Sequence, residues 1–178
     1  MSIAHTWGTR PDERALAFAS DGYIDGPIDA WYRGVTVDAP TPVVFRWLCQ
    51  LRVAPYSYDL IDNLGRRSPQ QLTPGLEALE VGQRVMTIFV LAEFEPDRQI
   101  TVRARRAVPF GSFAATYMVI EEPGGSTRLL VKISSPPPRG IRATIMHAVL
   151  AWGDLLMMRR QLLNLKRLAE RSARERVA

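Results

Sequence analysis

Between residues 84 and 134 the sequence alternates apolar and polar positions with the period of two that is typical of β-strands. Short turns interrupt the alternation at Pro96–Asp97 and at 123–126, so consecutive strands are expected to pair as an antiparallel meander. A shorter run of the same kind precedes them at 31–37. The expected inward positions are Val35 and Val37, then Met86, Ile88, Val90, Ala92 and Phe94, then Ile100, Val102 and Ala104, and finally Leu129, Val131 and Ile133.

Two segments have helical periodicity instead. The first is expected to start at Thr41 and Pro42 and to run to about Leu51. The second is expected at 141–171, after three consecutive prolines at 136–138 that favour an extended approach. Its apolar residues recur mostly at steps of three and four, which predicts one buried face. These residues are Ile141, Ile145, Ala148, Val149, Trp152, Leu155, Leu156, Leu162 and Ala169.

The order of these elements predicts an α+β fold. A helix of thirty residues is on the order of 45 Å long, and an apolar face of that length needs a broad surface to cover it. We therefore expect a curved antiparallel sheet of about six or seven strands wrapped around the long C-terminal helix. A cavity would lie between the sheet and the helix wherever the two do not meet tightly.

The segment 54–83 is irregular, and five polar or aromatic residues gather near its start. Two phenols and two carboxylates there could orient and polarise a carbonyl, and a desolvated aspartate could act as a base. The alternative is that the aspartates cap a turn and the phenol of Tyr58 packs. His147 on the long helix could likewise be an acid or base facing a cavity, or a hydrogen-bonded structural residue. The five residues are Tyr56, Tyr58, Asp59, Asp62 and Asn63.

Composition places the chain among single-domain globular proteins. It has 178 residues, 47% of them hydrophobic, and one cysteine, Cys49, which fits a reducing compartment. We expect a packed arm at 1–30, one domain at 31–172 and a polar tail at 173–178. The N-terminus lacks the pattern of a secretory signal and no uninterrupted apolar run reaches eighteen residues, so a cytoplasmic protein without membrane insertion is expected.

The net charge of +5 is concentrated near the C-terminus, where residues 159–176 hold seven basic and two acidic side chains. Basic residues at a helix C-terminus complement the helix dipole, which favours a solvated surface over binding of nucleic acid or an acidic membrane. No metal site is expected, because cysteine and histidine pairs with ligand spacing are absent from the sequence. No cofactor is expected either, because the sequence lacks the glycine-rich phosphate-binding motifs.

Four segments resemble one protein superfamily. RGVTVDAPTPVVFRWLCQL at 33–51 resembles the opening strand, Ala-Pro and Trp-containing helix of the SRPBCC superfamily, which is also called START-like or polyketide cyclase/lipid transport. YSYDLIDNLG at 56–65, LEVGQRV at 79–85 and DLLMMRRQLLNLKRLAE at 154–170 are similar to an uncharacterised bacterial branch of it. The resemblance covers residues 31–170. It implies the helix-grip fold, with an apolar cavity between the sheet and the long helix.

Members of that superfamily include polyketide aromatases and cyclases as well as lipid and hormone binders. The resemblance therefore implies binding of a polyketide-, aromatic- or lipid-like small molecule, with a cyclase- or dehydratase-like activity as a possible addition. A second hypothesis is a protein- or membrane-interaction module that uses the basic end of the long helix. The candidate catalytic residues are Tyr58, Asp59, Asp62 and His147. The expected ligand-binding residues are Tyr56, Tyr58, Asn63, Phe89, Tyr117, Met118, Ile145, Val149, Trp152 and Leu156.

Overall fold

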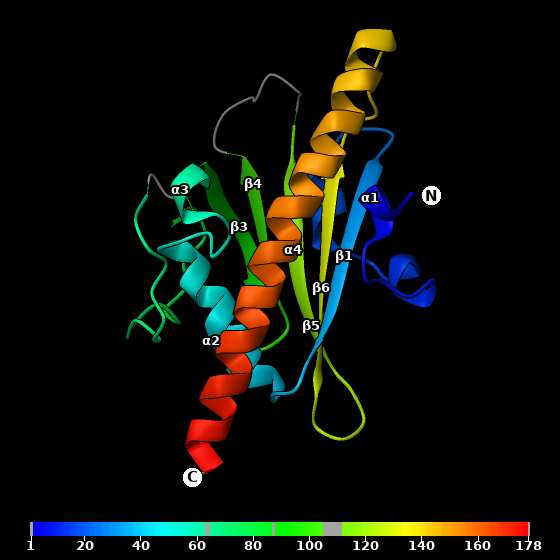
Figure 1. Cartoon of the computed structure of the whole chain (residues 1–178). Coiled ribbons are helices and arrows are strands. Elements are labelled where there is room, and N and C mark those ends of the chain that lie inside the picture. Colours follow the sequence, from blue (N-terminus) through cyan, green and yellow to red (C-terminus); the bar gives the residue numbers. More distant parts are fainter. Residues whose placement is uncertain (1, 63–64, 87, 105–111, 178) are drawn as a thin grey trace.

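The computed structural model describes residues 2–62, 65–86, 88–104 and 112–177. A six-stranded antiparallel sheet carries the long helix α4 and the shorter helix α2 on one face (Figure 1). The strand order is β1-β6-β5-β4-β3-β2. The elements are α1 (Ile3–Thr6), η1 (Asp12–Ala15), η2 (Ala19–Tyr23), β1 (Asp29–Val37), α2 (Thr41–Cys49), η3 (Gln50–Arg52), α3 (Asp59–Asp62), β2 (Arg84–Val85), β3 (Phe89–Glu95), β4 (Gln99–Ala104), β5 (Ala114–Glu121), β6 (Thr127–Ser135) and α4 (Ile141–Val177).

The predicted antiparallel sheet and its inward positions are confirmed in β4 and β6. Ile100 and Val102 of β4 are buried in the main core, as are Leu129, Val131 and Ile133 of β6. Each strand pairs with its neighbour along the chain from β2 to β6, and β1 then adds to the free edge of β6. In β4 and β6 the alternation is regular because one face of the sheet packs on the helices.

The single strand predicted at 84–96 is wrong. The structure has two strands there, β2 and β3, which pair with each other, and Met86 between them has a positive φ of 52°. The register against β4 also shifts between Leu91 and Glu93. This bulge brings Leu91, rather than Val90, to the buried face, and a one-residue insertion of this kind is invisible to a strict period of two.

Helix α4 is six residues longer than predicted, and its apolar residues divide between two faces. Leu155, Leu162 and Ala169 are buried as expected, together with Ala151 and Leu165. The remaining large residues of the predicted face are more than half exposed to solvent instead. The first half of α4 is thus apolar on nearly every side. For this reason the spacing of three and four assigned buried and exposed residues to a single predicted face. The exposed residues are Ile141, Ile145, Val149, Trp152 and Leu156.

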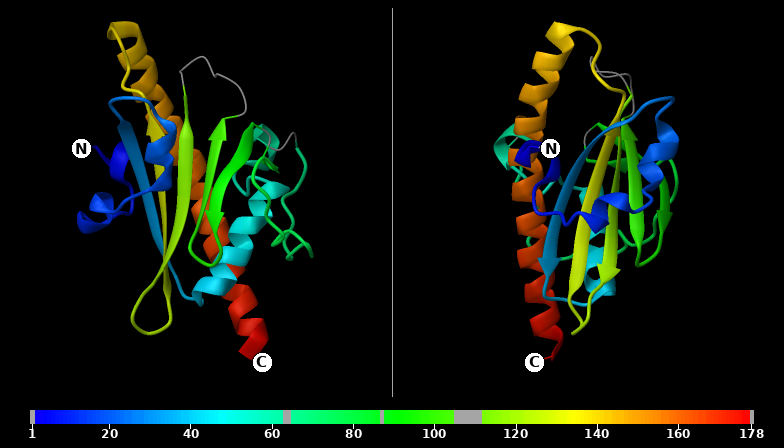
Figure 2. Two further views of the ribbon diagram at one scale, coloured as in Figure 1. Left: turned by 180° about the vertical axis from the view of Figure 1, so that it is seen from behind. Right: turned by 90° about the vertical axis from the view of Figure 1, so that its right-hand side faces the viewer.

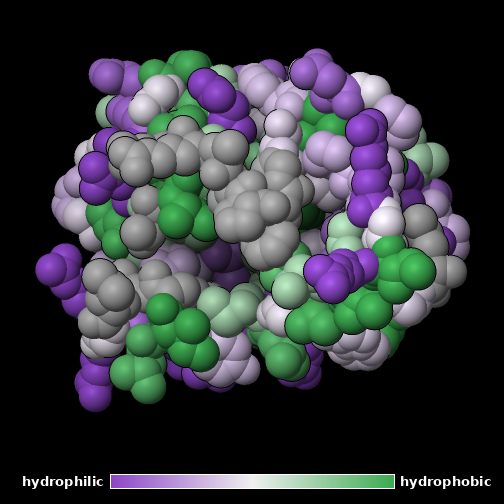
Figure 3. Space-filling view, turned by 90° about the horizontal axis from the view of Figure 1, so that it is seen from above, coloured by the Kyte–Doolittle hydropathy of each residue, from purple (hydrophilic) through white to green (hydrophobic). Residues whose placement is uncertain are grey.

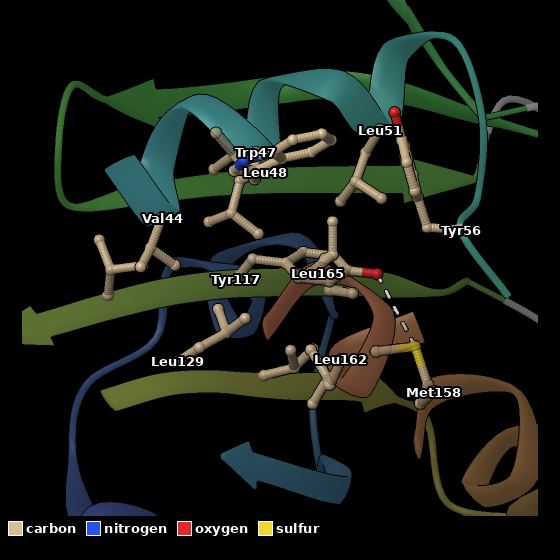
Figure 4. Close-up of a cluster of buried hydrophobic side chains, with 14 of the residues drawn as sticks. Val44, Trp47, Leu48, Leu51, Tyr56, Tyr117, Leu129, Met158, Leu162 and Leu165 are labelled. Carbon is tan, nitrogen blue, oxygen red and sulfur yellow. Dashed lines mark hydrogen bonds between the residues drawn. The ribbon is translucent and has the colours of Figure 1, made fainter. Parts of the chain in front are cut away.

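The core lies where α2 and the second half of α4 meet the sheet. Figure 4 shows Trp47 and Leu48 of α2 pointing toward the same cluster as Leu162 and Leu165 of α4. The indole of Trp47 is buried, and its Nε1 donates a hydrogen bond of 3.1 Å to the Ser172 hydroxyl. The two helices are therefore joined both by packing and by a specific polar contact.

The N-terminal segment starts with α1 beside β1 and α4, and its part with η1 and η2 then crosses the sheet face opposite α4 (Figure 2). Arg128 and Lys132 of β6 lie on that outer face, as their alternation predicts, but both side chains are buried under the segment. Glu13 accepts a hydrogen bond from Nε of Arg128 at 2.6 Å, and Asp21 pairs with Lys132 at 2.6 Å. Charges on this face are thus compensated by carboxylates of the arm rather than by water.

Candidate functional site

Two adjoining hollows lie between the inner sheet face and α4. The first has a volume of about 390 Å³ and the second of about 530 Å³. They share the side chains of Ile88, Phe89, Phe113 and Asp154. Figure 3 views the upper end of the molecule, where the surface is hollowed and hydrophobic side chains gather beside the hollow. The first hollow is lined further by Pro55, Ser57, Ile61, Met86, Val102, Ala115, Tyr117, Ile133, Met157, Met158 and Gln161.

One ion pair contributes the charge in this largely apolar space. Nη2 of Arg33 donates to Oδ2 of Asp154 at 2.7 Å. Arg33 is fully buried on the inner face of β1, and Nη1 donates to the carbonyl of Tyr32 at 2.9 Å. Burial raises the pKa of Asp154 to about 6, although the charge and hydrogen bond of Arg33 act in the opposite direction. Asp154 is the charged side chain on the wall that both hollows share.

A neutral hydrogen-bonded group lines the first hollow beside this pair. The Tyr117 hydroxyl donates to Oε1 of Gln161 at 2.8 Å and lies 3.7 Å from the sulfur of Met158 (Figure 4). Gln161 in turn donates to the carbonyl of Pro55 at 2.6 Å, which fixes the start of the irregular segment on α4. Burial raises the pKa of Tyr117, so its hydroxyl stays a neutral donor at physiological pH.

His147 and Trp31 line the second hollow. Nε2 of His147 is 3.2 Å from Oδ2 of Asp29, without the geometry of a hydrogen bond, and the imidazole meets the Trp31 indole edge-on at 4.9 Å between ring centres. Nε1 of Trp31, which lines this hollow, is one of the side-chain atoms in the described part of the chain that are buried without a hydrogen-bond partner. Buried polar groups are usually satisfied, so this end of the site suits an incoming acceptor atom. No group of three metal-ligating side chains is found in the described part of the chain.

Of the polar cluster predicted at 56–63, the described side chains of Tyr56, Tyr58 and Asp59 do not line the hollows. The Tyr56 ring is buried against Trp47, and the Tyr58 ring is partly exposed under the guanidinium of Arg160. Asp59 accepts hydrogen bonds from the amide and hydroxyl of Ser68, at 2.9 and 2.5 Å. Asp59 therefore ties the start of α3 to Ser68 of the irregular segment, which is a structural contact. The side chain of Asp62 and the whole of Asn63 lie outside the described residues.

The other predicted ligand-binding residues separate into two groups. Phe89, Tyr117 and Val149 line the hollows, whereas Met118 packs on the outer face of the sheet with Phe18 and Leu130. Ile145, Trp152 and Leu156 face solvent because they lie on the side of α4 that is turned away from the sheet.

Sequence reasoning missed Arg33, Asp154 and Gln161. A signal for Arg33 was present, because it alternates with Trp31 and Val35 and therefore occupies an inward position of β1. A charged residue at such a position needs a buried partner, and Asp154 is the one acidic residue in the first 29 residues of α4.

Residues 141–175 of α4 are long and apolar enough to cross a membrane by composition, and 11% of their most apolar window is buried. However, the second half of the same helix carries Leu162, Leu165 and Leu168 into the main core. In this fold α4 is therefore the core helix, and its exposed first half is a surface feature.

No model of a known protein family and no curated protein matches this chain. Solved structures do. A protein from Nitrosospira multiformis superimposes with a TM-score of 0.50 at 15% identity, over 78% of this chain and 94% of that one. The chain has the helix-grip fold. The sheet, its curvature around α4 and the element order confirm the fold that the sequence resemblance implied.

Two further solved structures superimpose on this chain with lower TM-scores. A protein from Mesorhizobium loti has a TM-score of 0.49 at 17% identity, over 80% of this chain and 98% of that one. The Zhui aromatase/cyclase from Streptomyces sp. R1128 has a TM-score of 0.46 at 13% identity, over 85% of this chain and 97% of that one.

The raised pKa of Asp154 predicts how its side chain affects stability across pH. The folded protein keeps this proton up to about pH 6, whereas the unfolded chain releases it near the ordinary value of 3.8. The contribution of the protonated carboxyl to the free energy of unfolding is therefore complete below pH 3.8 and is lost as the pH rises through 6. We expect the free energy of unfolding of the wild type, minus that of Asp154→Asn, to fall by about 3 kcal/mol between about pH 4 and pH 7. Urea unfolding of the two proteins measures this difference. A difference that grows with pH would contradict the raised pKa.

Proposed function

We propose that this protein binds an apolar small molecule, of polyketide-, aromatic- or lipid-like character, between the sheet and α4. The observation that carries this proposal is the pair of adjoining apolar hollows with Asp154 on their common wall, where its carboxylate is paired with the buried Arg33 behind it. Concave apolar sites with a few placed polar groups are the usual form of small-molecule sites.

The lining also indicates the shape of the ligand. Phe89 and Phe113 lie with ring centres 5.8 Å apart where the two hollows join, and the sulfurs of Met86, Met157 and Met158 add adaptable surface. Polar side chains line the space at Asp154, at the Tyr117–Gln161 pair of the first hollow and at the His147–Trp31 end of the second. A ligand with a flat apolar body and an oxygen atom at one position fits this arrangement.

A cyclase- or dehydratase-like activity is the second candidate function, and Asp154 favours it. A carboxyl group with a pKa of about 6 can both accept and donate a proton near neutral pH. Oδ2 is held by Arg33, and the side chain lines both hollows, so a ligand carbonyl or hydroxyl could reach it. Asp154→Asn would separate the two functions, since it removes proton transfer while keeping the shape of the site.

Filling the first hollow should abolish ligand binding. Ala115 lies on the inner face of β5, and Ala115→Phe would place a ring in the space now open beside Tyr117. We expect the affinity for 1-anilinonaphthalene-8-sulfonate, measured by fluorescence titration, to fall by more than about tenfold. The control is Ala15→Phe, which adds the same ring at an exposed position of the arm. Equal affinity in wild type and Ala115→Phe would refute the proposal.

The interaction hypothesis for the basic end of α4 receives less support. Arg167 and Arg171 both hydrogen-bond to Gln70, and the guanidinium groups of Arg159 and Arg160 lie over the rings of Trp7 and Tyr58. These arginines hold the irregular segment and the N-terminal segment to the helix. Their internal contacts account for much of the charge that suggested an external partner.

A further inference from the structure

The first half of α4 exposes a continuous apolar surface that the fold does not use. Ile141, Ile145, Val149, Trp152 and Leu156, here called the outer stripe, recur at steps of four, four, three and four. All five are more than half exposed, with Ile141 at 81% and Trp152 at 53%. In Figure 1 the first turns of α4 stand beyond the upper edge of the sheet. Apolar surfaces of this extent on soluble proteins usually mark an interaction site.

The charges around the outer stripe have one sign. Arg139 and Arg142 lie at the start of α4, and the first turn of the helix carries no acidic residue. From residue 139 to 169 the sequence has six lysine or arginine residues and one acidic residue, Asp154, which is turned inward to Arg33. An apolar helix face with a tryptophan and a basic border is the pattern of helices that lie in the interface of anionic membranes.

We propose that the outer stripe docks this protein on the surface of an anionic lipid bilayer. The exposed residues continue into the rim of the hollows, because Val149 lines the second hollow while Ile61 and Ile88 line the first, and all three are largely exposed. Docking along the stripe would place this rim near the lipid. The second half of α4 stays in the core, so the helix lies on the membrane and does not cross it.

A second copy of the chain is a poorer occupant for electrostatic reasons. Two α4 helices pairing antiparallel about Val149 and Trp152 would set Arg142 of one helix near Arg159 of the other. The sequence between them offers no acidic residue on the outer side to compensate this repulsion. An anionic lipid surface compensates the same arginines.

The test is co-flotation of the full chain with vesicles of phosphatidylcholine alone or mixed with phosphatidylglycerol. We expect wild type to float with the mixed vesicles, more weakly at high salt, and to remain below with phosphatidylcholine alone. Ile145→Glu/Trp152→Glu should lower the bound fraction more than about tenfold, because two side chains no longer enter the interface. The control is Val53→Glu/Val81→Glu, which changes two exposed apolar residues that belong neither to α4 nor to α1 beside it.

Circular dichroism of both double variants checks that the fold is kept, and binding of 1-anilinonaphthalene-8-sulfonate in the hollow should be unchanged in both. A wild type that does not float, or control and stripe variants that float equally, would overturn the proposal. It would also be overturned by sedimentation showing a dimer that only the stripe variant disrupts, with no vesicle binding. In that case the outer stripe covers a second copy of the chain.

Discussion

Replacing Arg33 by Met is expected to lower the free energy of unfolding by about 3–5 kcal/mol, because it leaves the carboxyl of Asp154 buried without its partner. Arg33 is fully buried and Asp154 is largely so, which makes compensation by water poor. The pKa of Asp154, already raised by burial, should rise further when the favourable charge is removed. Urea unfolding at neutral pH measures the effect.

The double variant Arg33→Met/Asp154→Leu should recover to within about 1 kcal/mol of wild type, since apolar residues of similar size can replace a buried ion pair. Arg98→Met is the matched control at an exposed pair with Glu95, where the expected cost is about 0–1 kcal/mol. If Arg33→Met behaves like Arg98→Met, the pair is solvated and the description of the site is wrong.

Leu162→Ala is expected to cost about 2–5 kcal/mol, because its side chain is fully buried and the cavity left behind cannot close completely. Leu156→Ala, six residues earlier on the same helix, should change stability by less than about 0.5 kcal/mol because that side chain is 59% exposed. Thermal and urea unfolding of the two variants compare the inner and outer faces of α4 directly. Equal losses would mean that the helix is rotated from the orientation described.

Much of the fold was predictable because β4 and β6 each have a clear alternation of inward apolar and outward polar residues. Leu129, Val131 and Ile133 have a single apolar face, and the turns between strands are short, so the topology follows. The orientation of α4 was not predictable, because Val149, Trp152 and Leu156 are as apolar as the residues that are buried. Which of two apolar faces meets a sheet is decided by shape complementarity in three dimensions, and a single sequence does not contain that comparison.

The candidate site was harder to predict for a related reason. The prediction placed chemistry where polar residues cluster along the sequence, at Tyr58 and Asp59, but in the structure Asp59 accepts hydrogen bonds from Ser68. The polar pair of the hollows instead comes from two residues 121 positions apart, Arg33 and Asp154. The inward position of Arg33 on a strand indicates that it needs a buried acidic partner. That this partner is Asp154 follows only once α4 is placed on the sheet.

The most direct test of ligand binding between sheet and helix uses the methionines as reporters. Met86, Met157 and Met158 line the first hollow, whereas Met118 lies on the outer sheet face and Met146 on the exposed part of α4. With ¹³C-methyl methionine labelling, titration with 1-naphthol should shift the methyl signals of the three lining residues in a saturable way. The signals of Met118 and Met146 should stay in place. Shifts confined to Met118 or Met146, or no saturable shift at all, would contradict binding in the hollow.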